Sequence, residues 1–283
     1  MSAPAPADSG FRQVRDLEVL SWPALERPGL DAVVTTRHGG ISGGRYASLN
    51  LSFSVGDTPG DVLENRRRLA VALDAEPADF VFAQQVHGNV ARVVGPDDRG
   101  RGTRSAADAI GGTDVLVTSD PGTVLAVLAA DCVPIVLHDP KAGVLACAHA
   151  GWRGTVARAA AAAVSAMESL GSRPADVTAG LGPAIAADHY EVGAEVAEAA
   201  RDAFGDRAGE VLRDHGPEHW TFDLWAANRL VLTEAGVPGG QIHDAGVATG
   251  PAGGDRFFSH RAARPCGRFA AVARLRPDPE ETR

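Results

Sequence analysis

GTVLAVLAADCVPIVLHD, at residues 122–139, is the stretch that decides the fold class, and AGVLACAHAGWRGT follows it at 142–155. Each is an apolar run that opens into a turn, and both predict buried β-strands. Asp131 interrupts the first run, where burial of an acid is costly unless a partner binds it. Because side chains alternate along a strand, Asp131 is expected to face away from Cys132 and to hold a backbone amide or an arginine.

One cysteine and two histidines stand near such apolar runs and predict a metal site. Cys132 and His149 lie in the two runs, and His87 lies upstream in AQQVHGNV at 83–90. Thiolate and imidazole bind zinc, imidazole also binds copper, and three ligands leave the fourth position open, as in catalytic zinc sites. The spacings of 45 residues (132 − 87) and 17 residues (149 − 132) match no zinc finger, so only tertiary structure can assemble this site. Taken singly, each residue also fits a core cysteine or a hydrogen-bonded histidine.

Composition narrows the class of protein. The 283 residues are 45% hydrophobic and 22% charged, as in globular chains. The net charge of −9 does not indicate binding to nucleic acid or to an anionic membrane surface. Three cysteines indicate a reducing compartment without a disulfide framework. Of these, Cys147 shares a strand face with His149 and is expected in the core rather than as a ligand. Because neither a signal peptide nor a membrane span is visible, a cytoplasmic protein is expected.

Strand pairs and helices are mixed along the chain, which favours an α+β fold over a doubly wound sheet. Strands are expected at 31–37, 80–94 (two, with a turn at His-Gly-Asn), 111–119, 123–139, 144–150, the start of 177–193, and both ends of 256–275. Helices are expected at 57–75, 154–171, 193–204 and 221–237, the last with Thr221 or Asp223 as its cap and Gly236 at its end. One domain is expected over 1–283, with a core at about 30–275 and frayed tails at 1–12 and 276–283.

Arginines at turns predict anion binding. Arg37 precedes a Gly/Ser-rich loop at 38–52, Arg153 lies within Gly-Trp-Arg-Gly, and Arg261 and Arg264 flank an Ala pair. A guanidinium beside a helix N-terminus binds anions well, and Arg153, four residues from His149, fits this best; a solvated charge is the alternative for each. The string HGGISGG matches neither a dinucleotide fingerprint nor a P-loop.

Several of these segments together resemble the YfiH family, also described as laccase-domain or polyphenol oxidase proteins. The similarity runs in order through TTRHGGISGGRYASLNLS (35–52), QQVHG (84–88), GTDVLVTSDPG (112–122), AADCVPIVLHDP (129–140), AHAGWRGT (148–155), LGPAIAADHYEVG (181–193), FDLWAANRLVL (222–232) and FFSHRAARPCGRFAAV (257–272). The resemblance implies a layered α/β/β/α arrangement with mixed sheets, related to the cysteine-based catalytic domain of a bacterial toxin. It also implies that His87, Cys132 and His149 are the metal ligands.

The same resemblance implies an enzyme, a zinc-dependent purine nucleoside phosphorylase acting on adenosine, inosine, guanosine and methylthioadenosine, with an adenosine deaminase side activity. The expected partners are a purine nucleoside and phosphate, without nucleic acid or membrane, and the expected state is a monomer or weak homo-oligomer. The site residues expected on this basis fall into two groups. The catalytic group is His87, Cys132, His149 and Arg153, and the substrate-binding group is Arg37, Gly39, Gly40, Asn50, Asp131 and Arg261.

This chain departs from the family pattern in two loops. The loop GPAIAADHYEV lacks the cysteines that the family often carries, and Ala248-Thr249 replaces the usual Cys-Thr. His260 stands at an aromatic position of the family. The three expected ligands are unaffected, but copper chemistry that needs extra thiols is disfavoured.

Three other functions use the same residues. A copper-dependent polyphenol oxidase is the first, with Cu²⁺ in the same site, although a multicopper laccase needs many clustered histidines and the nine here include no His-x-His pair. A cysteine hydrolase with Cys132 as nucleophile and His149 as base is the second. Peptidoglycan-precursor editing, proposed for one bacterial branch of the family, is the third. A non-enzymatic binding module ranks last.

Overall fold

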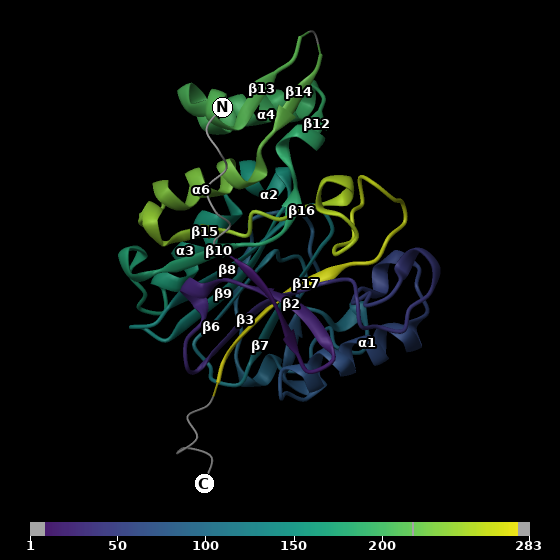
Figure 1. Cartoon of the computed structure of the whole chain (residues 1–283). Helices are drawn as coiled ribbons and strands as arrows, with labels where there is room; N and C mark the ends of the chain where they lie inside the picture. Colours follow the sequence, from purple (N-terminus) through teal and green to yellow (C-terminus); the bar gives the residue numbers. More distant parts are fainter. Residues whose placement is uncertain (1–8, 217, 277–283) are drawn as a thin grey trace.

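The apolar runs build two six-stranded sheets that pack face to face in the computed structural model, which describes residues 9–216 and 218–276 (Figure 1). The first sheet has the order β1 (Gly10–Val14), β2 (Leu17–Ser21), β3 (Leu30–Thr35), β17 (Phe269–Leu275), β7 (Val124–Ala129) and β4 (Phe80–Phe82). The second has the order β15 (Ile242–Asp244), β10 (Thr178–Leu181), β8 (Val133–Asp139), β9 (Val144–Ala150), β6 (Val115–Thr118) and β5 (Ala91–Val93). Parallel and antiparallel pairs occur in both, so the sheets are mixed.

Smaller elements complete the chain. Strand β11 (Ala184–Ile185) pairs with β16 (Ala248–Thr249), and a three-stranded sheet holds β12 (Glu191–Val192), β14 (Trp220–Phe222) and β13 (Leu212–Asp214). The helices are α1 (Pro59–Ala72), α2 (Trp152–Val156), α3 (Ala159–Glu168), α4 (Ala194–Phe204), α5 (Ala208–Val211) and α6 (Leu224–Glu234). The three-stranded sheet and α4 project from one end of the molecule (Figure 1). None of the helices in the described ranges is long and apolar enough to cross a bilayer.

Alternation along the strands sorts their side chains into layers. In β9, Leu145 and Cys147 lie in the apolar core between the sheets, whereas Ala146 and Ala148 lie in the core beneath α3 and α6. In β7, Leu125 likewise lies between the sheets, while its neighbours on the strand pack with α1 on the far side. The inner strands β7 and β9 are therefore apolar on both faces, as expected for sheets covered on both sides, whereas the edge strands β1 and β5 are partly exposed. The order helix, sheet, sheet, helix confirms the expected α+β fold and its α/β/β/α layers.

The long apolar run at 123–139 is not one strand, contrary to the expectation. It divides into β7 and β8, which belong to different sheets, with a break at 130–132 where Asp131 has a left-handed φ of 87°. The physical reason lies with the buried carboxylate of Asp131, which at this break accepts hydrogen bonds from the Arg261 backbone N–H (2.6 Å) and the Thr249 hydroxyl (2.5 Å) that offset its lost hydration. The argument from strand alternation therefore does not apply to Asp131 and Cys132, but the backbone-amide partner expected for Asp131 is confirmed.

Three other expectations about local structure are wrong. The helix expected at 154–171 begins earlier, at Trp152, and is interrupted by Arg158 with a φ of 66°, giving α2 and α3. Residues 256–259 form no strand, and the tail expected to fray up to residue 12 already holds β1 from Gly10. The expectations for 1–8 and 277–283 lie outside the described residues, and the single domain stays a prediction.

The remaining elements agree with expectation. Strands β3, β6 and β9 and helices α1, α4 and α6 lie within or close to their expected ranges. The cap of α6 is Asp223, whose carboxylate accepts from the Ala226 N–H at 2.9 Å, and Gly236 follows the helix with a φ of 93°.

Two connections cross from the first sheet to the second at the same end of the structure. Strands β4 and β7 are parallel neighbours, so the segments 83–90 and 130–132 that follow them leave side by side and lead to β5 and β8. Strand β17 is antiparallel to β7 and pairs Phe269 with Ala129, so its first residue lies at this end as well. The crossing end therefore gathers residues from three distant parts of the chain.

The core between the sheets is expected to dominate stability. Leu125→Ala removes a side chain with 0% exposure from this core and is expected to lower the free energy of unfolding by about 2–5 kcal/mol. The matched control Leu63→Ala, at a position 42% exposed on α1, is expected to change it by less than about 0.5 kcal/mol. Urea unfolding of both variants measures the difference, and equal effects would contradict the layered core.

Candidate metal centre

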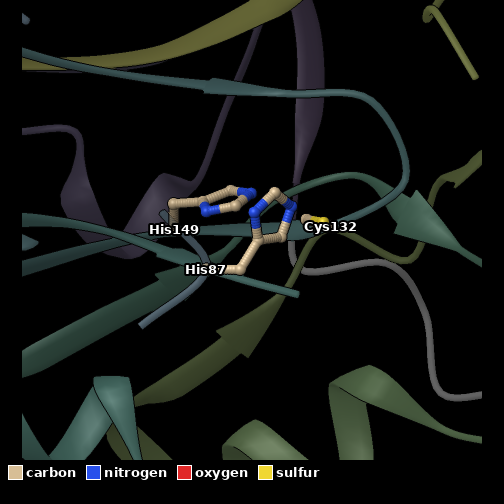
Figure 2. Close-up of side chains that lie close together, drawn as sticks. All are labelled: His87, Cys132 and His149. Atoms are coloured by element: carbon tan, nitrogen blue, oxygen red, sulfur yellow. The ribbon is translucent and has the colours of Figure 1, made fainter. Parts of the chain in front are cut away.

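The crossing end brings His87, Cys132 and His149 together (Figure 2). One ligand atom of each lies within 4.8 Å of the others, and the two imidazole rings stand edge to face with centroids 4.9 Å apart. His87 comes from the β4–β5 connection, Cys132 from the β7–β8 connection and His149 from β9. The expected convergence of these three side chains is confirmed, and they are called the triad below.

Asp114 is the residue that organises the triad, and the sequence patterns above do not single it out. Its buried carboxylate accepts the backbone N–H groups of Val86 (3.1 Å), His87 (3.0 Å) and Gly88 (2.7 Å) and lies 2.9 Å from the His149 Nδ1. The backbone oxygen of Asp114 also accepts from the His149 N–H at 2.8 Å. With Nδ1 bound to a carboxylate, His149 presents its Nε2 to a metal, the usual arrangement for ligand histidines.

The same carboxylate holds His87 in place. His87 has a left-handed φ of 62°, which is uncommon for a residue with a side chain and needs support from its surroundings. The support is the run of three consecutive N–H groups around His87 that point at Asp114. Burial raises the pKa of Asp114, but the His149 imidazole and the backbone N–H groups outweigh burial and lower it, so the carboxylate is charged at neutral pH.

Gly151 lets the triad close because it has no side chain. A Cβ at this position would lie 2.7 Å from the Cys132 sulfur and 3.1 Å from a carbon of the His87 ring. Gly151 follows β9 directly and is the N-cap of α2, so the backbone itself forms one wall of the site. Gly151 has a φ of −77°, which other residues can also adopt. The first position of the Gly-Trp-Arg-Gly turn therefore needs glycine because of the close packing and not because of its backbone conformation.

The triad is electrostatically coupled. Burial acts to raise the pKa of the Cys132 thiol, but the charges of His149 and His87 and their hydrogen bonds lower it to about 6. Burial acts to lower the pKa of His149, but Cys132 and Asp114 raise it to about 9. The thiol is therefore poised to ionise, and a thiolate with two imidazoles is a donor set that suits zinc.

Cys147 takes no part in this site. It lies in the apolar core between the sheets with 0% exposure, and burial raises the pKa of its thiol well above the usual range. The expectation that Cys147 is a core residue is confirmed. Within the described residues, the triad is the one group of three or more His, Cys, Asp or Glu side chains placed to share an ion, so no additional copper cluster is formed there.

A cavity of about 380 Å³ opens onto the triad. Its apolar wall includes Phe53, Val55 and Leu128, and its polar groups include Gln84, Arg66, His260 and Arg268. A cavity of this size with a few convergent polar groups is typical of small-molecule sites. Apart from the triad, the polar lining consists of residues that the sequence patterns above do not single out as ligands of a substrate.

Two of the expected arginines lie outside this cavity. Arg153 is in the first turn of α2, stacks 4.1 Å from the Trp152 ring and pairs with Glu195 at 3.0 Å. Arg261 donates both of its terminal nitrogens to the Glu191 backbone oxygen. Burial raises the pKa of the Tyr190 phenol and the Cys132 charge raises it further, while Arg261 and Arg153 lower it, so Tyr190 lies within electrostatic reach of all three.

The site residues expected at 37–40 make contacts that hold their own loop in place. Arg37 donates to the Ala47 backbone oxygen at 2.7 Å and lies over the Phe258 ring. A side chain on Gly40 would collide with the backbone of Ser48 at 2.1 Å. Gly39, which has a left-handed φ of 91°, packs against Leu17. None of these residues is among those that line the cavity, so they hold the loop rather than face the triad.

Asn50 and Asp131 form hydrogen bonds with the backbone of residues that line the cavity or lie next to it. The Asn50 carboxamide oxygen accepts from the backbone N–H groups of Ser52 and Arg268, both of which line the cavity. Asp131 binds the backbone N–H of Arg261, next to the cavity residue His260. A signal for Asp114 was present in the sequence, since it is an acid at the start of an apolar strand, the same signal that singled out Asp131.

The chain is similar to known proteins over most of its length. A family model described as multi-copper polyphenol oxidoreductase laccase matches residues 31–276. The chain belongs to this family. The similarity to the structure of YfiH from Bacillus licheniformis identifies it as the expected YfiH family, with a TM-score of 0.89 and 33% identity over 94% of this chain and 99% of the other. The structure of YlmD from Geobacillus stearothermophilus gives a TM-score of 0.90 and 37% identity over 96% and 100% of the two chains.

Curated relatives of this YfiH-family chain carry two kinds of enzyme name. Purine nucleoside phosphorylase YlmD of Geobacillus stearothermophilus is 40% identical over 87% of this chain and 91% of its own length. A purine nucleoside phosphorylase of Deinococcus radiodurans is 42% identical over 89% and 93%. Adenosine deaminase RL5, from an unknown prokaryotic organism, is 41% identical over 80% and 86%.

The Asp114 contact makes a prediction about metal affinity. Asp114→Asn keeps the size of the side chain but removes the charge that orients His149 and the His87 turn, so zinc affinity is expected to fall about 10–100-fold. Competition with a chromophoric chelator measures it.

The matched control is Asp139→Asn. Asp139 is also a buried carboxylate that accepts three backbone N–H groups, those of Lys141, Ala142 and Arg173, but it lies away from the triad. Its substitution is expected to lower stability without changing zinc affinity. Equal zinc affinity in the two variants would show that Asp114 has no role beyond holding the fold.

Proposed function

We propose that this chain is a zinc-dependent purine nucleoside phosphorylase with an adenosine deaminase side activity. The observation that carries the proposal is the convergence of His87, Cys132 and His149 in the lining of a cavity of about 380 Å³, in a chain related over most of its length to proteins with these two names. A cytoplasmic location and a monomeric or weakly oligomeric state remain predictions.

The residues present fit a divalent ion. Three donors come within 4.8 Å of one another, one imidazole is oriented by a carboxylate, and the thiol has a lowered pKa. Thiolate together with imidazole favours zinc, and copper is the alternative. When bound, such an ion supplies a Lewis acid that polarises oxygen atoms and lowers the pKa of water.

The protein's own residues divide the remaining work. The apolar wall formed by Phe53, Val55 and Leu128 suits a planar purine and excludes water from it. Asp114 holds the two ligand segments at a fixed separation. Arg153 and Arg261 supply positive charge near Tyr190, whose pKa both of them lower. In this proposal Arg37, Gly39, Gly40, Asn50 and Asp131 position the loops around the substrate rather than touching it.

The proposal predicts a measurable reaction. Purified protein with inosine and phosphate is expected to release hypoxanthine and ribose 1-phosphate, and removal of metal by a chelator is expected to abolish the reaction until zinc is restored. Cys132→Ala is expected to lower kcat/KM at least about 100-fold because a three-ligand site loses its thiolate. Chromatography of the products and elemental analysis of the protein give both readouts.

The matched thiol control is Cys147→Ala, in the core between the sheets, which is expected to retain activity. Full activity in Cys132→Ala, or in protein free of metal, would remove the metal from the mechanism. Stoichiometric copper together with oxidation of phenols and no phosphorolysis would favour the polyphenol oxidase instead.

One observation favours a second candidate, a cysteine hydrolase. Asp114 binds the His149 ring at 2.9 Å and His149 lies within 4.8 Å of the Cys132 sulfur, an order that resembles acid, base and nucleophile in cysteine enzymes. The lowered pKa of the Cys132 thiol fits a nucleophile as well as it fits a ligand. The two functions differ in whether the thiolate is bound to a metal.

Alkylation distinguishes these two functions. In the zinc enzyme, iodoacetamide is expected to label Cys132 slowly in the zinc-loaded protein and rapidly after chelation, because a bound thiolate is a poor nucleophile. Mass spectrometry of the peptide that contains Cys132 measures the rates, and buried Cys147 serves as the internal control. Equally rapid labelling of both forms would support the hydrolase.

A further inference from the structure

The final strand carries an arginine to the triad. Arg268 directly precedes β17, the strand between β3 and β7, and the next residue, Phe269, pairs with Ala129 at the end of β7. Cys132 lies three residues beyond Ala129. Arg268 lines the same cavity as the triad. Its backbone is therefore held next to the first residue of a strand that is paired on both sides, at the end where the triad converges.

The guanidinium of Arg268 is held but not saturated. Its Nη1 donates to the backbone oxygens of Cys266 at 2.8 Å and Gly267 at 3.0 Å, and its backbone N–H donates to Asn50 at 2.9 Å. Within the described residues, every hydrogen bond of the Arg268 side chain is made by Nη1, including a contact to the Cys266 sulfur at 3.4 Å, and none by Nε or Nη2. An arginine fixed at one nitrogen with a free Nε–Nη2 edge is preorganised to bind an oxyanion through two parallel hydrogen bonds.

The neighbouring arginines are committed elsewhere. Arg66 also lines the cavity, but it donates from Nε and both terminal nitrogens to backbone oxygens, including that of Leu51 at 2.9 and 2.6 Å, and it packs between Phe53 and Phe82. Arg153 is paired with Glu195, and Arg261 with a backbone oxygen. Of the cavity's arginines, Arg268 is thus the one with donors to spare.

We propose that Arg268 binds the phosphate co-substrate in the cavity beside the triad. This inference rests on the proposed function and names which residue holds the anion. In phosphorolysis, an oxygen of hydrogen phosphate forms a bond to C1′ of the nucleoside while the C1′–N9 bond breaks. The electron pair of that bond stays on the purine, which takes the proton of the hydrogen phosphate, and ribose 1-phosphate is the other product. Arg268 holds the attacking dianion and spreads its charge.

The two expected activities separate this role from a structural one. Deamination of adenosine consumes water and needs no phosphate, so Arg268→Ala is expected to raise the KM for phosphate on the order of 10–100-fold and to leave deamination within about twofold. Arg268→Lys keeps the charge but loses the paired donors, so its KM for phosphate is expected to lie between those of the wild type and Arg268→Ala. Initial rates at varied phosphate, with inosine saturating, measure the first quantity.

The control is Arg256→Ala, an exposed arginine that packs on Phe11 and faces Glu18, which is expected to change neither activity. Parallel loss of phosphorolysis and deamination in Arg268→Ala would show a structural role, and an unchanged KM for phosphate would also overturn the proposal. Calorimetric titration of the zinc-loaded wild type and Arg268→Ala with inorganic phosphate measures phosphate binding by each protein without turnover. If the wild-type protein binds phosphate but catalyses no phosphorolysis, and Arg268→Ala binds phosphate more weakly, the anion site is supported and the proposed function is rejected.

Discussion

The carboxylate of Asp114 joins two ligand segments that lie far apart in the chain. It accepts three consecutive N–H groups around His87 and binds the His149 ring, so one buried charge sets the positions of two of the three triad residues. Such a buried carboxylate is stable only because each of these donors compensates for its lost hydration. The third ligand, Cys132, then closes onto the bare backbone of Gly151. The geometry of the centre thus depends on one acid and one missing side chain.

The layered architecture explains why the site lies where it does. Strands β4 and β7 are neighbours in the first sheet, and the chain passes from the end of each to the second sheet. These two connections contain His87 and Cys132. His87 and Asp131 lie outside the named strands, so the backbone of each crossing can adopt the left-handed conformations seen at these two residues. The two apolar sheets hold the ends of each crossing in register.

Arginines in this chain show how similar residues take different roles according to their neighbours. Arg66 is saturated by backbone oxygens and joins two walls of the cavity, whereas Arg268 keeps one edge of its guanidinium free. Arg153 pairs with Glu195, and Arg261 donates to the Glu191 backbone oxygen. The free edge of the Arg268 guanidinium therefore suits a reaction whose proposed co-substrate is a dianion.

The residue pattern by itself determined the apolar strands, most helices, the α+β class and the identity of the triad, because hydrophobic periodicity and ligand chemistry are local properties. Only the tertiary structure decided that the run at 123–139 divides between two sheets, that Asp114 orients the ligands, and that Arg268 rather than Arg37 or Arg153 faces the cavity. The physical reason is that which donor remains unpaired, and which backbone approaches a sulfur atom, depends on neighbours from distant parts of the chain.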